Sequence, residues 1–103
     1  MNELVELVQE WAIERNLQTA DPTKQYLKVV EEVGEIASGL ARNKLSEVED
    51  GIGDTIVTLI ILAMQLDLKV DECLLTAYNE IKDRKGKMID GVFVKESDLT
   101  NVK

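Results

Sequence analysis

Two acidic stretches decide the fold: EEVGE at residues 31–35 and DGIGD at residues 50–54, each opening onto apolar residues. The first and last residues of each stretch are four apart, so on a helix they share a face. The short polar stretch at residues 41–46 is typical of the turn in a helical hairpin. The sequence therefore predicts a hairpin that directs four or five carboxylates at one small volume.

Such a carboxylate cluster predicts a bound cation. Like charges that close repel, and burial penalises them further, unless a cation lies among them. The chain has no histidine and one cysteine, so oxygen atoms would supply the ligands. A hard ion is expected for such a donor set, with Mg²⁺ as the cofactor and Mn²⁺ as its substitute.

Apolar residues recur at helical spacing over most of the chain. The predicted helices cover residues 2–16, 22–42, 47–67 and 71–86. Asp21 before Pro22 is a typical helix start, and Ser46 followed by Glu49 predicts a capping box for the third helix. Gly86 is the expected C-terminal stop.

The third predicted helix is apolar nearly all round from residue 55 to residue 64, which predicts cover by a second subunit. Gly51 and Gly53 lie inside this helix, at a cost of about 1 kcal/mol each relative to alanine. They indicate close approach of either a ligand or the neighbouring helix. Both interpretations stay open.

The end of the chain changes character. Residues 88–94 place an Asp-Gly turn between short β-formers, which predicts a hairpin. We expect an all-α, four-helix domain at residues 1–86 and a tail, either hairpin or extended, at residues 87–103. The helical part is expected to assemble as a homodimer or homotetramer of bundled hairpins.

Composition excludes several classes of function. A formal net charge of −8 argues against binding a nucleic-acid polymer. Cys73 has no partner for an intramolecular disulfide, which favours a reducing compartment. The N-terminus lacks a signal-peptide pattern, and the apolar stretch at residues 56–64 is too short to span a membrane. We expect a cytoplasmic protein.

Two further features each have two interpretations. Trp11 is either a core anchor or a surface on which a ligand ring stacks. The basic residues Lys82, Arg84 and Lys85 either complement a helix dipole or form a phosphate site.

Taken in order, these motifs resemble the MazG family of all-α nucleoside triphosphate pyrophosphohydrolases. The resemblance covers roughly residues 25–85 and rests on EEVGE, the turn, GIGD before an apolar helix, and NEIKDRK at residues 79–85. The tail GKMIDGVFVKESDL, at residues 86–99, is similar to that of small phage-encoded and bacterial MazG-like proteins.

The family pattern is Glu-Glu-x-x-Glu followed by Glu-x-x-Asp. The residues that match it directly are Glu31, Glu32, Glu35 and Asp54. Gly51 departs from the pattern, since an acidic residue is expected there. Asp50 lies on the same face as Asp54, and we assign it the missing ligand role. A rival register pairs Glu47 with Asp50 and leaves Asp54 as an extra ligand.

The resemblance implies hydrolysis of a nucleoside triphosphate, ribose or deoxyribose, to the monophosphate and pyrophosphate. The metal ligands it implies are Glu32, Glu35, Asp50 and Asp54, and Glu31 would orient or deprotonate the attacking water. The predicted catalytic residues are Glu31, Glu32, Glu35 and Asp54. The predicted substrate-binding residues are Trp11, Asn79, Lys82, Arg84 and Lys85.

Two alternatives remain. A helical oligomer that binds metal and nucleotide, or a protein partner, without turnover would fit the departure at Gly51. A purely structural oligomer would leave the acidic patches as solvated faces.

Overall fold

The computed structural model describes residues 2–99, and over these residues the chain is mostly helical, as predicted. It forms two compact units, Met1–Glu72 and Cys73–Lys103. The helices of the first unit are α1 (Asn2–Glu14), the 3₁₀ helix η1 (Leu17–Thr19), α2 (Pro22–Ala41) and α3 (Leu45–Gln65). Next along the chain come α4 (Val70–Ile81), β1 (Gly86–Ile89), β2 (Val92–Lys95) and α5 (Glu96–Leu99). The domain boundary at residue 86 stays a prediction.

The ends of α1 and α2 follow from local chemistry. Asn16 adopts a left-handed φ of 59°, which stops the chain from continuing as α1. Asp21 is the N-cap of α2, and its side chain accepts a hydrogen bond from the Thr23 amide at 2.9 Å. Pro22 occupies the first helical position, where no backbone donor is needed. The predicted start of this helix is confirmed.

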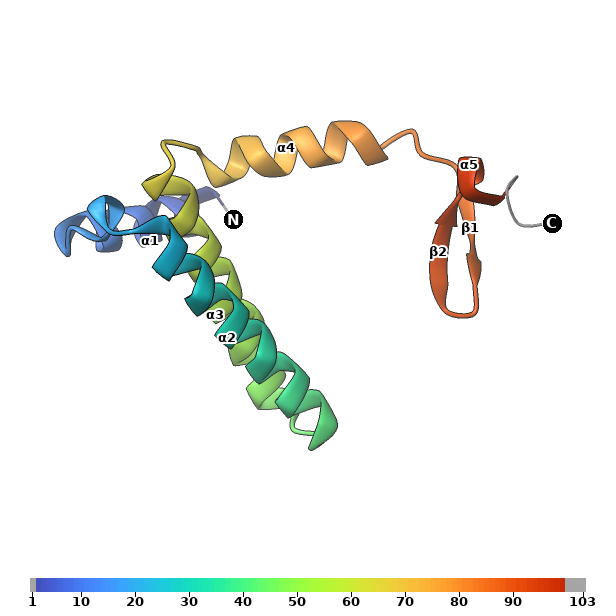
Figure 1. Ribbon diagram of the computed structural model, residues 1–103, viewed down its shortest axis with the longest axis horizontal. Helices are drawn as coiled ribbons and strands as arrows, with labels where there is room; N and C mark the ends of the chain where they lie inside the picture. Colours follow the sequence, from blue (N-terminus) through green and yellow to red (C-terminus); the bar gives the residue numbers. More distant parts are fainter. Residues whose placement is uncertain (1, 100–103) are drawn as a thin grey trace. The chain divides into compact units, whose positions relative to one another are not determined.

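The helices α2 and α3 run side by side as an antiparallel hairpin, and α1 lies across the end where α2 begins and α3 finishes (Figure 1). The first unit buries a small apolar core. Its members are Val5, Ala12, Val29, Val48, Ile60, Ile61 and Ala63. A bond from the Gln65 side chain to the Leu17 carbonyl, 3.1 Å long, ties η1 to the end of α3.

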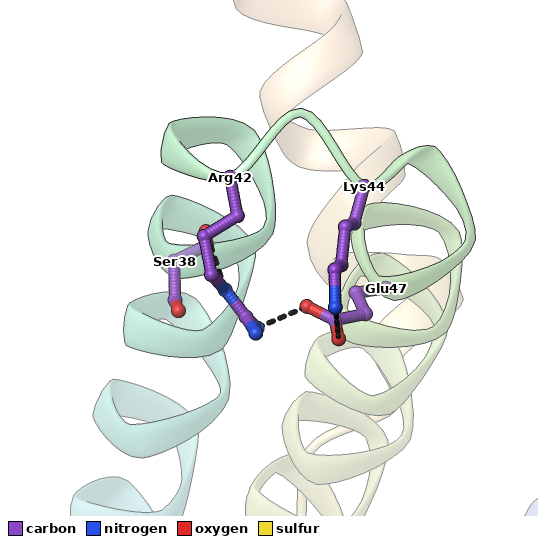
Figure 2. A network of polar contacts seen from close by, with 4 residues as sticks. All are labelled: Ser38, Arg42, Lys44 and Glu47. Carbon is purple, nitrogen blue, oxygen red and sulfur yellow. Dashed lines mark hydrogen bonds and ion pairs between the residues drawn. The ribbon is translucent and has the colours of Figure 1, made fainter.

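The predicted capping box at Ser46 is wrong. The N-cap of α3 is Lys44, which makes no side-chain capping bond, so the helix begins two residues earlier than predicted. Glu47 is held instead by the Arg42 guanidinium and by the Lys44 ammonium at 3.9 Å (Figure 2). Arg42 also donates to the Ser38 carbonyl at 3.5 Å. The turn is therefore closed by ion pairs.

Glycine allows α2 and α3 to approach closely. A Cβ on Gly51 would lie 2.9 Å from Cγ1 of Ile36, and one on Gly39 would lie 3.1 Å from Cγ2 of Val48. A Cβ on Gly53 would meet no atom within 4 Å in the described part of the chain. Of the two interpretations of Gly51, close packing against the neighbouring helix has direct support.

The difference in free space around Gly51 and Gly53 gives a stability prediction. Alanine at either position gains helix propensity, but at Gly51 it must displace Ile36. Because overpacking costs about 1–3 kcal/mol, we expect Gly51→Ala to be less stable than Gly53→Ala by that amount. Urea unfolding followed by circular dichroism at one protein concentration measures the difference. Equal midpoints would contradict the packing at Gly51, and a large loss for Gly53→Ala would indicate a neighbour outside this chain.

The apolar third helix is only partly covered. Ile60 is 2% exposed, whereas Ile56 and Leu59 on the same helix are each 40% exposed. Within residues 2–99 no single helix is long and apolar enough to cross a membrane. The helices α3 and α4 reach the required length and hydropathy only when they are counted together, and the helical run is interrupted between them. Cover of the exposed side by another subunit stays a prediction.

The second unit contains the predicted hairpin. β1 and β2 pair antiparallel, with Ile89 opposite Val92. Asp90 and Gly91 have φ values of 51° and 79°. Positive φ at both central positions is the type I′ geometry that Asp-Gly favours. A backbone bond of 2.7 Å from the Glu96 amide to the Lys85 carbonyl joins the start of α5 to the segment before β1.

Candidate metal centre and adjoining cleft

Three of the predicted carboxylates meet on the hairpin. Glu32 and Glu35 of α2 and Asp54 of α3 each offer an oxygen, and these oxygens lie within 4.8 Å of one another. Glu32 and Asp54 are half-buried, and Glu35 is exposed. We call these three residues the carboxylate cluster. The two helices touch where Gly51 of α3 packs against Ile36 of α2. Glu32 lies one turn before Ile36, and Asp54 lies about one turn after Gly51. Because the helices are antiparallel, these two positions lie on the same side of the contact.

The carboxylate cluster is strained electrostatically without a cation. The pKa of Glu32 is raised first by loss of solvation and then by the charges of Glu35 and Asp54. The pKa of Asp54 is raised first by loss of solvation and then by the charge of Asp50. Oxygen Oε2 of Glu32 is shielded from solvent and has no hydrogen-bond partner among the described residues. An unpaired, shielded carboxylate oxygen is a ligand position that a cation would satisfy.

Asp50 lies beside the cluster without joining it. Its carboxyl group raises the pKa of Asp54 through charge repulsion and a hydrogen bond. It also lines a hollow of about 280 Å³, and the other lining residues are Glu35, Ser38, Arg42 and Glu47. Glu47, which the rival register makes a ligand, is already paired with Arg42 and Lys44. Geometry therefore favours the register in which Asp54 is the final aspartate of the pattern over the one that pairs Glu47 with Asp50.

Glu31 takes no part in this arrangement. Its side chain is exposed, it is not one of the three clustered carboxylates, and it does not line the cleft beside them. Its role toward the attacking water stays a prediction with no geometric support.

A cleft of about 450 Å³ adjoins the cluster within the first unit. The residues that line it are Trp11, Leu17, Gln25, Lys28, Glu32, Asp54, Val57, Thr58 and Ile61. Its volume lies within the range of roughly 300–1,000 Å³ that small-molecule sites occupy. Trp11, which is 45% exposed, thus shares one cleft with two of the clustered carboxylates. The ligand-stacking interpretation of Trp11 gains support from this placement.

Lys28 and Gln25 are among the cleft residues that the sequence reasoning missed. Lys28 precedes Glu32 by four residues, a spacing that places both on one face of α2 and that would have identified it. Within residues 2–99 no ion pair engages Lys28, so its charge is free for a ligand. The Gln25 amide donates to the Thr58 carbonyl at 3.1 Å and so links α2 to α3 across the cleft wall.

The other predicted substrate-binding residues lie in the second unit, where Arg84 and Lys85 are brought together and Asn79 and Lys82 are not. The hollow that Arg84 and Lys85 share is about 470 Å³. Its other lining residues are Glu80, Asp83, Lys95, Glu96 and Ser97. Asn79 and Lys82 do not line this hollow, and both are exposed.

The raised pKa values give a stability prediction for the metal-free protein. Above the ordinary value of 4.5 for Glu32, the native state binds more protons than the unfolded chain. The free energy of unfolding therefore falls as pH rises through the raised folded pKa. Because Glu32→Gln removes this charge, we expect it to melt progressively higher than the parent protein as pH rises from 4 to 7 in EDTA. Melting curves that shift in parallel would contradict the repulsion.

Comparison with known proteins finds one informative likeness. No protein-family model matches the chain, and no solved structure matches it significantly. The chain is similar to an uncharacterized 18.2 kDa protein from the rep-hol intergenic region of Haemophilus phage HP1 (strain HP1c1). The two are 42% identical over 66 residues, which is 63% of this chain and 40% of the phage protein. The chain thus matches less than half of its relative's length, and the likeness assigns neither family nor activity.

Proposed function

We propose that this chain is a Mg²⁺-dependent nucleoside triphosphate pyrophosphohydrolase of the MazG type. The observation that supports the proposal best is the position of the carboxylate cluster. Two of its three members line a cleft that also holds an exposed tryptophan and a lysine that forms no ion pair with any described residue. These groups match the three parts of a metal–nucleotide complex: the carboxylates suit the metal ion, the lysine suits the phosphates, and the tryptophan suits the base.

The residues present fit a hard divalent ion. The donor set is all oxygen, its atoms are close enough to share one ion, and the shielded Oε2 of Glu32 has no hydrogen-bond partner in the described part of the chain. Glu32, Glu35 and Asp54 would hold the ion, with Asp50 beside them. Bound there, Mg²⁺ would neutralise phosphate charge and lower the pKa of water at the reacting phosphate.

The side chains of the cleft would position the substrate. Lys28 would pair with phosphate oxygens, where its unpaired ammonium contributes charge-assisted hydrogen bonds. The Trp11 indole would stack on the base. One water would add across the anhydride between the α and β phosphates and give the monophosphate and pyrophosphate. Positioning and charge stabilisation dominate such phosphoryl chemistry.

The remaining expectations belong to the same proposal. Arg84 and Lys85, with Lys82 and Asn79, would stabilise the pyrophosphate leaving group. The homodimer or homotetramer would cover the half-exposed apolar residues of α2 and α3, among them Val30, Val33 and Ile56. Both expectations, and the cytoplasmic location, stay predictions.

Product analysis tests the proposal. A panel of ordinary, deoxy and damaged nucleoside triphosphates is incubated with the protein, with Mg²⁺ or with EDTA, and the products are separated. The expected result is monophosphate and pyrophosphate in equal amounts, only with Mg²⁺. Release of single phosphates, or turnover in EDTA, would contradict it.

One observation favours the second candidate, a binding module without turnover. A Cβ at position 51 would lie 2.9 Å from Cγ1 of Ile36, so an acidic residue at this position would have to displace the Ile36 side chain. If the family ligand at that position is essential, Asp50 would have to replace it. Binding of Mg²⁺ and nucleotide without any product across the panel would support this alternative.

A further inference from the structure

The indole of Trp11 has a cation over one of its faces. The guanidinium carbon of Arg15 lies 4.3 Å from the centroid of the ring, within the range of a cation–π contact. Nitrogen Nη1 of Arg15 also donates to the Trp11 carbonyl at 3.0 Å. These two contacts to one residue hold the guanidinium in place relative to the indole.

The end of α1 places Arg15 in this position. Arg15 follows the last residue of the helix, and its amide donates to the Ala12 carbonyl at 3.2 Å. Arg15 is four positions after Trp11, so the two side chains lie on the same face of the helix. Glu14 is the other charged neighbour of Arg15, with its carboxylate 3.8 Å from Nη1.

Trp11 also lines two hollows. One is the cleft beside the carboxylate cluster. The other is an apolar hollow of about 310 Å³ lined by Leu4, Leu7, Val8, Trp11 and Val57. Arg15 lines neither of them. The guanidinium thus lies over the indole without lining either hollow.

We infer that Arg15 is a positioning residue for a nucleobase subsite: it fixes the Trp11 indole as the aromatic wall of the cleft. The inference rests on the proposed function in taking the ligand to be a nucleotide. A base bound in the cleft completes a stack of guanidinium, indole and base. Because the indole is already held, binding loses less side-chain entropy.

Calorimetric binding titrations with Mg²⁺ test this role. The probes are the α,β-methylene derivatives of the four common deoxynucleoside triphosphates and, as a probe without a base, inorganic tripolyphosphate. Arg15→Gln removes the stack, and Arg15→Lys keeps the charge without the plane. Glu14→Gln is the matched control, because it breaks the ion pair and keeps the stack.

The expected loss follows from the strength of the contact. An exposed cation–π contact contributes about 0.5–1 kcal/mol, which corresponds to about two- to fivefold in affinity. We expect Arg15→Gln to weaken nucleotide binding by that factor and to leave tripolyphosphate binding unchanged. The nucleotide affinity of Arg15→Lys should lie between those of Arg15→Gln and the parent protein, and that of Glu14→Gln should equal the parent's. In the Trp11→Leu background, Arg15→Gln should have no further effect.

The sole tryptophan gives a second readout, because its emission should change with nucleotide and much less with tripolyphosphate. The inference is overturned if no nucleotide binds, if Arg15→Gln leaves nucleotide affinity unchanged, or if it weakens both probes equally. These outcomes need no turnover. Failure of hydrolysis alone would overturn the proposed function and leave Arg15 in its role.

Discussion

Replacing Asp54 with asparagine is expected to abolish Mg²⁺-dependent release of pyrophosphate and to leave the helical circular dichroism spectrum intact. Glu35→Gln should have the same effect. Each change removes a charged oxygen from the carboxylate cluster and keeps the shape of the side chain. A metal ligand contributes several kcal/mol to charge stabilisation, so the expected loss of kcat is about a hundredfold or more.

The control for this pair is Glu49→Gln. Glu49 is an exposed acidic residue of α3 that belongs neither to the carboxylate cluster nor to the lining of the cleft. Its neutralisation changes the net charge by the same amount and should leave turnover within about twofold of the parent protein. Retained turnover in both Asp54→Asn and Glu35→Gln would remove the carboxylate cluster from the mechanism. Equal loss in Glu49→Gln would show that net charge was responsible.

Lys28→Gln is expected to lower kcat/KM by about ten- to a hundredfold. A hydrogen bond to a charged group contributes about 1.5–3 kcal/mol, and the Lys28 ammonium has no competing ion pair within residues 2–99. Because Lys28 belongs to the cleft and not to the metal ligands, the affinity for Mg²⁺ alone should not fall. Steady-state kinetics at saturating Mg²⁺ separates the two effects.

Lys24→Gln is the matched control for Lys28. Lys24 lies one turn earlier on α2, is exposed, and does not line the cleft. We expect its kcat/KM to stay close to that of the parent protein. If both lysine variants lose activity equally, general attraction of the anionic substrate explains the loss and Lys28 has no specific contact.

The start of α2 and the hairpin were predictable because their signals are local, whereas the predicted stop of the fourth helix at Gly86 is wrong: α4 ends at Ile81, and Gly86 is the first residue of β1. Asp21 before Pro22 combines a favoured N-cap with proline at the first helical position, and Asp90 and Gly91 adopt the positive φ values that a two-residue hairpin turn requires. The start of α3 was predicted wrongly, because the backbone becomes helical two residues before the predicted start. The Lys44 carbonyl accepts hydrogen bonds from the amides of Glu47 and Val48, so Lys44 is the N-cap and Ser46 already lies inside the helix.

The site was predictable only in part. Helical spacing and the hairpin turn together placed Glu32, Glu35 and Asp54 in one volume, as the structure has them. Spacing alone could not assign Gly51, because its close contact with Ile36 depends on how far apart two helices pack. It also could not show which charges are already paired. That distinction separates Lys28, which has no ion pair among residues 2–99, from Arg42, which is bound to Glu47.

The most direct test of the central claim is binding of Mn²⁺ to the metal-free protein, measured by electron paramagnetic resonance of the free ion. Mn²⁺ prefers the same oxygen ligands as Mg²⁺ and can be counted. We predict a saturable site in the parent protein and in Glu49→Gln that is lost or much weakened in Glu35→Gln and Asp54→Asn. Equal binding by all four proteins, or no saturable binding by the parent, would contradict a metal centre at Glu32, Glu35 and Asp54.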